Sequence, residues 1–531
     1  MKKKLLTLVI LLIYGGTLFA CTNLIVTKGA SKEGSAFLVY LNDGEWHPHL
    51  TITPAADHDI NDSLVFQSIS GKKYKIHQVA HTYRETGILM NEHQLALGET
   101  TFTGRMELWD KTLPLKYWDL MKLTLQRAKT AREAIRVMTS LVEQYGYGSE
   151  GESFSIADPN EAWLLEMIGT GGAGGAVWVA IRIPDGMVTA HANHSRIGTF
   201  PLDDPDNCLY SKNVIKLAVK KGYYQLQSGK PFKFNDVYDP PTPAHLKYTE
   251  TRVWSLFRRM APSQNFLPDY HRGEAGAKPY PLYIKPDNKI GLKDVFSLIR
   301  DHYEGTDFDM TKGLAAGPFG NPNRPRPMEW EENGKKYSWE RPISTPQTAY
   351  SYVAQLRSGL PDDFALAWFS FDDTYTNCYF PFYIAANKIP PSYQTGDIRH
   401  FDRASMWWAF NFVSNFANIR YQPMVKDIKK VQQQLETKFI NQQDSVEREA
   451  LKVSHNERIK KLTSFSIASG NEVHNQWIEL GNYLVMKYND GYVKDANGHT
   501  KTAGYPKAWL KAITKQEGVR YIINESNKKG N

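Results

Sequence analysis

The chain has 531 residues, of which 41% are hydrophobic and 23% are charged, a composition typical of a folded protein with one large core or two smaller ones and not of a disordered chain. Its formal charge of +8 comes from basic residues that are spread along the chain, so nucleic-acid binding is not expected. Only three cysteines are present, Cys21, Cys208 and Cys378. This number excludes a disulfide scaffold: either Cys208 pairs with Cys378, or none is bridged.

The first 20 residues have the layout of a secretory signal. Lysines at positions 2–4 precede an apolar run over residues 5–13, and small residues follow up to Ala20. The apolar run is shorter than the roughly 20 residues that a membrane-spanning helix needs, and no later segment is a better candidate. We therefore expect a signal peptide over residues 1–20 and an exported protein, periplasmic or extracellular, without stable membrane insertion after cleavage.

Cys21 follows this leader directly, and two interpretations compete for it. If the chain is cut after Ala20, Cys21 carries a free α-amine with a pKa near 7.7–8.0, which can accept the thiol proton as a general base. Alternatively, Leu18 to Cys21 form a lipobox, in which Cys21 anchors a surface lipoprotein to a lipid. The leader alone favours neither interpretation.

The first part of the chain predicts antiparallel sheets and a helix pair. Two runs of β-branched and aromatic residues, 21–27 and 36–43, flank a turn-rich segment and predict a hairpin. Apolar residues at helical spacing predict amphipathic helices over residues 115–126 and 130–144. Residues 153–193 then contain four short strand patterns with Asp-Pro-Asn and Pro-Asp-Gly turns, which indicate antiparallel hairpins.

Three further regions follow. Residues 227–341 are rich in Pro and Gly and predict long loops that shape a cleft. Strand patterns resume at residues 364–373 and 377–386, so the first domain is expected to close near Pro390, and residues 391–531 show mostly helical periodicity. The order sheet, helix pair, sheet is typical of an α+β fold in which helices cover the outer faces of stacked antiparallel sheets.

Several motifs resemble known sites without the context that those sites need. GTGGAG, residues 169–174, matches a dinucleotide-binding pattern but lies between two predicted strands, where a hairpin loop is expected. His47 and His49, and His191 and His194, form close pairs without an HExxH helix or a cysteine cluster. We expect these histidines to be hydrogen-bonded near a sheet edge, and we expect no metal and no other cofactor.

Six segments taken together identify a family. In chain order they are CTNLIVTKGASKEGS, NEHQLALGETTF, SFSIADPNEAWLLEMIG, VWVAIRIPDGMVTAHANHSRI, DHYEGTDFD and RPISTPQTAYSYVAQLR. From Cys21 to about Pro390 the chain resembles the dipeptidase A family of cysteine peptidases, members of the N-terminal-nucleophile hydrolase superfamily. The resemblance implies a four-layer αββα fold over residues 21–390, dipeptide substrates, and amide-bond hydrolysis through a thioester.

The resemblance also implies roles for individual residues. Cys21 matches the nucleophile, and its own α-amine matches the base. Asp43 occupies the place where related acylases keep an aspartate near the nucleophile, whereas Tyr40 replaces the arginine usually found three residues earlier. Asn193 lies in the region that supplies an oxyanion-stabilising amide.

Three more residues are candidates. Arg252 matches an arginine near the active site, with a surface ion pair as the alternative. Glu92 and Glu99 lie in the NEHQLALGET segment near the expected cleft, where a carboxylate can recognise the ammonium group of a dipeptide. The sequence thus predicts an exported cysteine dipeptidase. The alternatives are an amidase of N-acylated small molecules on the same fold, or a non-catalytic lipoprotein lipidated at Cys21.

Overall fold

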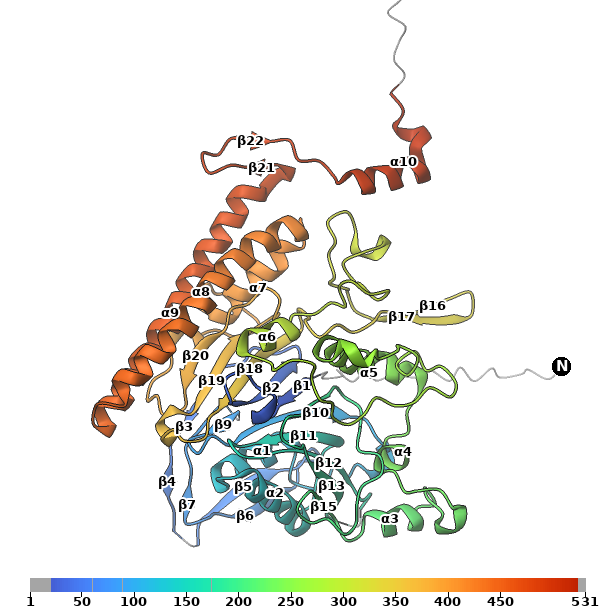
Figure 1. Cartoon of the computed structure of the whole chain (residues 1–531), viewed down its shortest axis with the longest axis vertical. Helices are drawn as coiled ribbons and strands as arrows, with labels where there is room; N and C mark the ends of the chain where they lie inside the picture. Colours follow the sequence, from blue (N-terminus) through green and yellow to red (C-terminus); the bar gives the residue numbers. More distant parts are fainter. Residues whose placement is uncertain (1–20, 60, 88, 173, 524–531) are drawn as a thin grey trace, which may run out of the picture.

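The computed structural model describes residues 21–59, 61–87, 89–172 and 174–523 (Figure 1). The expected signal peptide, residues 1–20, lies outside the described residues. None of the helices in these ranges combines the length and apolar character needed to cross a membrane.

Two antiparallel sheets form the centre of the molecule. The six-stranded sheet has the order β14-β1-β2-β18-β19-β20 and the eight-stranded sheet the order β15-β13-β12-β11-β10-β9-β8-β3. The strands of the first are β14 (Val188–His191), β1 (Thr22–Val26), β2 (Ala36–Asp43), β18 (Thr348–Leu356), β19 (Leu366–Phe371) and β20 (Phe380–Tyr383). Those of the second are β15 (Cys208–Tyr210), β13 (Ala176–Arg182), β12 (Ala162–Gly169), β11 (Gly151–Ala157), β10 (Ala96–Phe102), β9 (Met90–Asn91), β8 (Glu85–Thr86) and β3 (Ile52–Thr53).

The two sheets face each other, and helices cover both outer faces. Strands β1 and β2 contact β10 and β11 across the sandwich. Helices α1 (Tyr117–Arg127) and α2 (Ala131–Tyr145) pack on the eight-stranded sheet, as the helical spacing predicted. Helix α5 (Pro243–Met260) packs against β14, and α7 (Met406–Ala417), α8 (Tyr421–Ala450) and α9 (His455–Tyr488) pack on β19 and β20. The fold is therefore the expected α+β arrangement of four layers.

Strand β12 shows why this arrangement buries both faces of a sheet. Its side chains alternate in direction, as in any strand. Trp163 and Leu165 join the core beneath α1 and α2, whereas Leu164 and Ile168 join the core between the sheets. The segment therefore shows an almost continuous apolar run instead of a polar and apolar alternation.

Strand β14 does not form the hairpin with β13 that the sequence predicted. Strands β11, β12 and β13 pair in sequence, and the GTGGAG segment joins β12 to β13 as the expected hairpin loop. Strand β14 instead leaves this sheet and pairs with β1 in the other one. The turn between them is held to the other sheet, because the Asp185 carboxylate accepts a hydrogen bond from the backbone N–H of Gly29 at 2.6 Å. This crossing carries the residues after β14 to the start of β1.

Residues 227–341 also differ from the expected long loops, because they contain helix α5. Thr242 caps this helix by accepting a hydrogen bond from the backbone N–H of His245, and Pro243 occupies its first turn, both of which favour helix initiation. The other elements are short or peripheral. They are α3 (Val214–Lys220), α4 (Phe234–Tyr238), α6 (Leu292–Leu298), α10 (Lys507–Tyr521), and the hairpins β4/β7 (Ala56–Asp57, His81–Thr82), β5/β6 (Ser63–Gln67, Lys73–His77), β16/β17 (Glu329–Glu332, Lys335–Ser338) and β21/β22 (Val493–Lys494, Thr500–Lys501).

The C-terminal region is mostly helical, as predicted. Figure 1 shows α8 and α9 running side by side along β19 and β20, with α10 at the far end of the molecule. The three cysteines are unbridged and buried, so the second of the two alternatives for Cys208 and Cys378 holds.

Candidate active site

Cys21 lies immediately before β1, inside the sandwich, with 1% of its surface exposed. Its sulfur is 3.3 Å from Glu99 Oε1, 3.8 Å from Asn42 Nδ2 and 3.9 Å from the Tyr40 hydroxyl. Burial raises the pKa of the Cys21 thiol well above its usual value, and the negative charges of Glu99 and Asp43 raise it further. The thiol is therefore protonated at neutral pH in this chain, where the Cys21 nitrogen is still part of a peptide bond to Ala20.

Arg252 holds the backbone of Cys21. From α5, its Nη1 donates to the Cys21 carbonyl at 2.6 Å and to Thr22 Oγ1 at 2.9 Å, while its Nη2 donates to Asn193 Oδ1 at 3.0 Å. The side chain is fully buried, so it is not a surface ion pair. Burial, together with the positive charge of Arg341, lowers the pKa of Arg252 to about 10. Arg252 thus joins the start of β1 to the segment that follows β14.

Asn193 is the other residue at this junction. It has a φ of 61°, a left-handed conformation that non-glycine residues adopt rarely, with asparagine among the most tolerant. Its Nδ2 donates to the Thr101 carbonyl at 2.8 Å, and its Oδ1 accepts from Arg252. The structure thus brings Asn193 to the same arginine that holds Cys21.

Asp43, at the end of β2, is buried beside Cys21 in a network of its own. Arg341 Nη2 donates to its Oδ2 at 2.6 Å, and Thr348 donates to its Oδ1 at 2.6 Å. Burial raises the pKa of the Asp43 carboxyl, although Arg341 and Thr348 stabilise its charged form. Arg341 lies 298 positions away in the sequence, and no local pattern around it signals this contact.

The structure places Glu99 and Glu92 in different surroundings. Glu99 contacts the Cys21 sulfur and accepts a hydrogen bond from the Tyr40 hydroxyl, whereas the half-buried Glu92 accepts from the backbone N–H of Arg84 at 3.0 Å. Arg84 in turn donates to the Ile384 carbonyl at 2.8 Å. The structure therefore brings Glu99 to the candidate nucleophile and does not bring Glu92 there.

The sequence predictions missed two neighbours on β2 and a second carboxyl. In the hairpin Asn23 is paired with Tyr40, so Tyr40 and Asn42 point to the same face as Cys21, and the hairpin register could have identified them. Glu152, on β11, is fully buried beside Glu99, with its Oε2 held by the Thr101 hydroxyl at 3.1 Å. Burial and the Glu99 charge raise the pKa of the Glu152 carboxyl well above its usual value.

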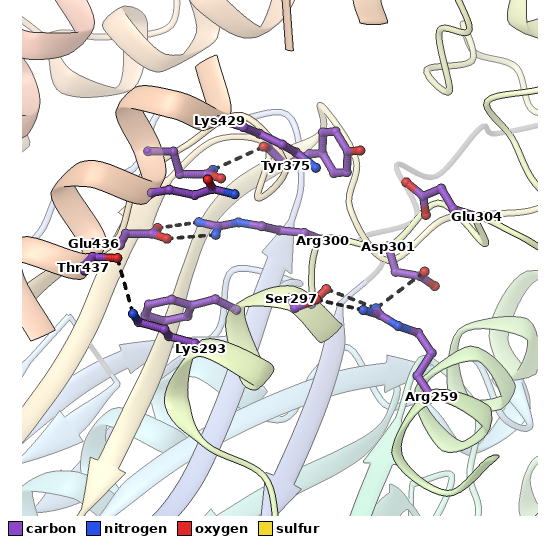
Figure 2. Close-up of a pocket in the computed structure, with 13 residues that line it drawn as sticks. Arg259, Lys293, Ser297, Arg300, Asp301, Glu304, Tyr375, Lys429, Glu436 and Thr437 are labelled. Carbon is purple, nitrogen blue, oxygen red and sulfur yellow. Dashed lines mark hydrogen bonds and ion pairs between the residues drawn. The ribbon is translucent and has the colours of Figure 1, made fainter. Parts of the chain in front are cut away.

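A separate polar pocket of about 700 Å³ lies between α5, α6 and α8, and Cys21 is not among the residues that line it (Figure 2). Across it, Arg300 forms two hydrogen bonds with the Glu436 carboxylate, at 3.0 and 2.5 Å. Glu436 Oε1 also accepts from the backbone N–H of Tyr379. This pocket lies where the C-terminal helix α8 packs against the rest of the chain.

Comparison with known proteins identifies the family to which the chain belongs. The sequence model of Peptidase family C69 matches residues 20–434. A protein named "Probable dipeptidase" from Latilactobacillus sakei is 26% identical over 396 residues, which cover 71% of this chain and 76% of the relative. A "Probable dipeptidase" from Salmonella dublin is 26% identical over 414 residues, covering 75% and 88%. A "Probable dipeptidase B" from Streptococcus pyogenes serotype M1 is 23% identical over 454 residues, covering 81% and 85%. This chain therefore belongs to Peptidase family C69 and is a hydrolase of peptide bonds.

Proposed function

We propose that this chain is an exported dipeptidase in which cleavage between Ala20 and Cys21 exposes Cys21 as an N-terminal nucleophile. One observation carries the proposal: among the described residues, the groups hydrogen-bonded to the sulfur are a carboxylate, a phenol and an amide, and none is an imidazole. A thiol with a raised pKa needs a base. The nearest nitrogen that can supply one is the α-amine that cleavage creates.

The reaction follows from these groups. The free α-amine takes the thiol proton, and the thiolate attacks the peptide carbonyl carbon to form a tetrahedral intermediate. The carbon–nitrogen bond then breaks, the leaving amine takes the proton from the α-ammonium group, and a thioester remains on Cys21. Water, deprotonated by the same amine, hydrolyses the thioester and regenerates the thiol.

The surrounding residues have distinct parts in this scheme. Arg252 and Asp43 are positioning residues: Arg252 holds the Cys21 carbonyl and the Asn193 side chain, and the backbone of Asp43 lies within hydrogen-bonding reach of the Cys21 thiol. The Asn193 amide is the candidate donor to the negatively charged oxygen of the intermediate. Its Oδ1 accepts from Arg252 and its Nδ2 donates one N–H to Thr101, and these two bonds keep the amide in one place.

Dipeptide specificity is supported by the names of the relatives and by the buried carboxyl groups. A dipeptide carries a free ammonium group close to its scissile bond, and a carboxylate is the natural partner for that group. Glu99, 3.3 Å from the sulfur, is our candidate for this partner. Glu152 beside it adds a second carboxyl to the same subsite.

The N-terminus provides the test. We expect mass spectrometry of the mature protein to find an unmodified Cys21 as its first residue, and a diacylglyceryl-modified Cys21 would contradict the mechanism. The chain starting at Cys21 should hydrolyse free dipeptides, whereas the full chain should be inactive until residues 1–20 are removed. Cys21→Ser should lose most activity and still fold, and Cys378→Ser is the matched control because its thiol is also buried. Preference for N-acyl amino acids over dipeptides would indicate the amidase instead.

A further inference from the structure

A second cluster of polar side chains lies next to Asn193. It joins three segments: His194 after β14, Asp239 after α4, and His245 in the first turn of α5. One ring nitrogen from each histidine and a carboxylate oxygen of Asp239 lie within 4.8 Å of one another. His194 Nε2 is 3.8 Å from Asp239 Oδ2, and the two imidazole rings meet edge to face with centroids 5.1 Å apart.

The histidines are held by their other nitrogens. His245 Nε2 is 2.8 Å from the Asn193 carbonyl and therefore donates to it, and His194 Nδ1 is 3.4 Å from Glu250 Oε1. In a neutral imidazole, a nitrogen that donates leaves the opposite nitrogen as a bare lone pair. His194 Nε2 is such an atom: it is buried and has no hydrogen-bond partner. A histidine that ligates a metal characteristically donates its second N–H to a carboxylate or a backbone carbonyl.

The carboxylate is oriented in the same way. Asp239 Oδ2 accepts from the backbone N–H of Ser195 at 2.9 Å, and its Oδ1 accepts from that of Gly104 at 3.2 Å. These bonds fix the direction of the carboxylate and leave further lone pairs on its oxygens, because each carboxylate oxygen can accept two bonds. Asp239 is 3% exposed, so few water molecules can reach those lone pairs.

The charges around the cluster do not balance when the imidazoles are neutral. Three buried carboxylates, from Asp239, Glu250 and Glu166, lie around it, and the guanidinium of Arg196 pairs with Glu250. Among these four groups the formal excess is two negative charges, which is costly in a buried site. A divalent cation cancels this excess, whereas a proton on His194 cancels half of it.

We propose that His194, Asp239 and His245 form a binding site for a divalent transition-metal ion of the zinc class. Two imidazoles and one carboxylate are a typical ligand set for such an ion. The ion would tie the segment after β14 to α4 and α5, and through the His245 bond to the Asn193 carbonyl it would hold Asn193 in its left-handed conformation. The site is structural: it acts on catalysis by positioning the Asn193 amide and takes no part in proton transfer.

Metal content of the full, untagged chain is the direct test, because a histidine tag would itself bind zinc. After incubation with Zn²⁺ and dialysis against metal-free buffer, elemental analysis should find about one zinc per chain. Co²⁺ in its place should give visible absorption bands of a low-symmetry site. His194→Gln and Asp239→Asn should lose both signals, and Zn²⁺ should raise the melting temperature of the wild type and not of these variants.

Two controls separate this site from other zinc ligands. Cys21→Ser should keep the bound zinc, since a thiol beside Glu99 is the main competing site. His81→Gln should also keep it, because His81 pairs at the surface with the single carboxylate of Asp57. Zinc that is lost in Cys21→Ser and kept in His194→Gln would overturn the proposal. A wild-type chain that retains less than about 0.1 zinc per molecule would overturn it whether or not the variants fold, and would leave a buried imidazolium as the explanation of the geometry.

Discussion

Glu99→Gln tests whether the carboxylate beside the nucleophile recognises the ammonium group of the substrate. Glutamine keeps the shape of the side chain and removes its charge. A hydrogen bond to a charged group contributes about 1.5–3 kcal/mol, so kcat/KM for a free dipeptide should fall by roughly 10- to 150-fold. The same dipeptide with an acetylated N-terminus carries no ammonium group, and it should lose far less.

The comparison between the two substrates is what makes the experiment decisive. Glu99 also touches the Cys21 sulfur, so its loss can change the nucleophile itself, but that effect is shared by both substrates and cancels in the ratio of their kcat/KM values. Tyr40→Phe is the matched control: it removes the hydroxyl that donates to Glu99 and leaves the charge. An equal loss for the free and the acetylated dipeptide in Glu99→Gln would refute the assignment.

Three further predictions concern stability and positioning. Glu152 has a raised pKa in the folded state, so its contribution to stability is full below its unfolded pKa and is lost as the pH rises through the folded value. Glu152→Gln should therefore reduce the loss of stability with rising pH. In urea unfolding, the free energies of unfolding at pH 5 and pH 8 should differ less in this variant than in the wild type. A steeper difference would contradict the buried, protonated state. Arg252→Met should cost about 3 kcal/mol of unfolding free energy, because it leaves buried acceptors unpaired. Arg252→Lys should restore little activity, because an ammonium group cannot span the same acceptors. Full turnover by the lysine variant would show that a bridge between Cys21 and Asn193 is unnecessary. Arg300→Met should lower the unfolding free energy by about 3–5 kcal/mol, since it leaves Glu436 buried and unpaired. Replacing Glu436 by leucine in the same chain should recover most of the loss. If Arg300→Met had no effect in urea unfolding, the pair would not hold α8 in place.

Local patterns predicted much of the fold. The hairpin at Cys21, the helix pair and the loop at GTGGAG all depend on side-chain periodicity and turn residues within a few positions of one another, and the structure confirms each of them. Asp43 was expected from the family resemblance, and the hairpin that contains Cys21 brings the end of β2 next to it. Such features can be predicted because each depends on neighbours in the sequence.

Contacts between distant segments were decided by the tertiary structure. The crossing of β14 into the other sheet brings Asn193 to Cys21, and a helix inside an expected loop region brings Arg252 to both. The sequence patterns of HANHSR and TRVWSLF contain no information on this crossing, because it is stabilised by contacts between residues about 150 positions apart, such as Asp185 with Gly29. The same holds for His194, whose neighbours Asp239 and His245 no spacing rule connects to it. The sequence alone thus pointed to Cys21 and, with it, to Asp43, Glu99, Asn193 and Arg252. Only the packing of the sheets decided how these side chains contact one another, because those contacts join segments far apart in the chain.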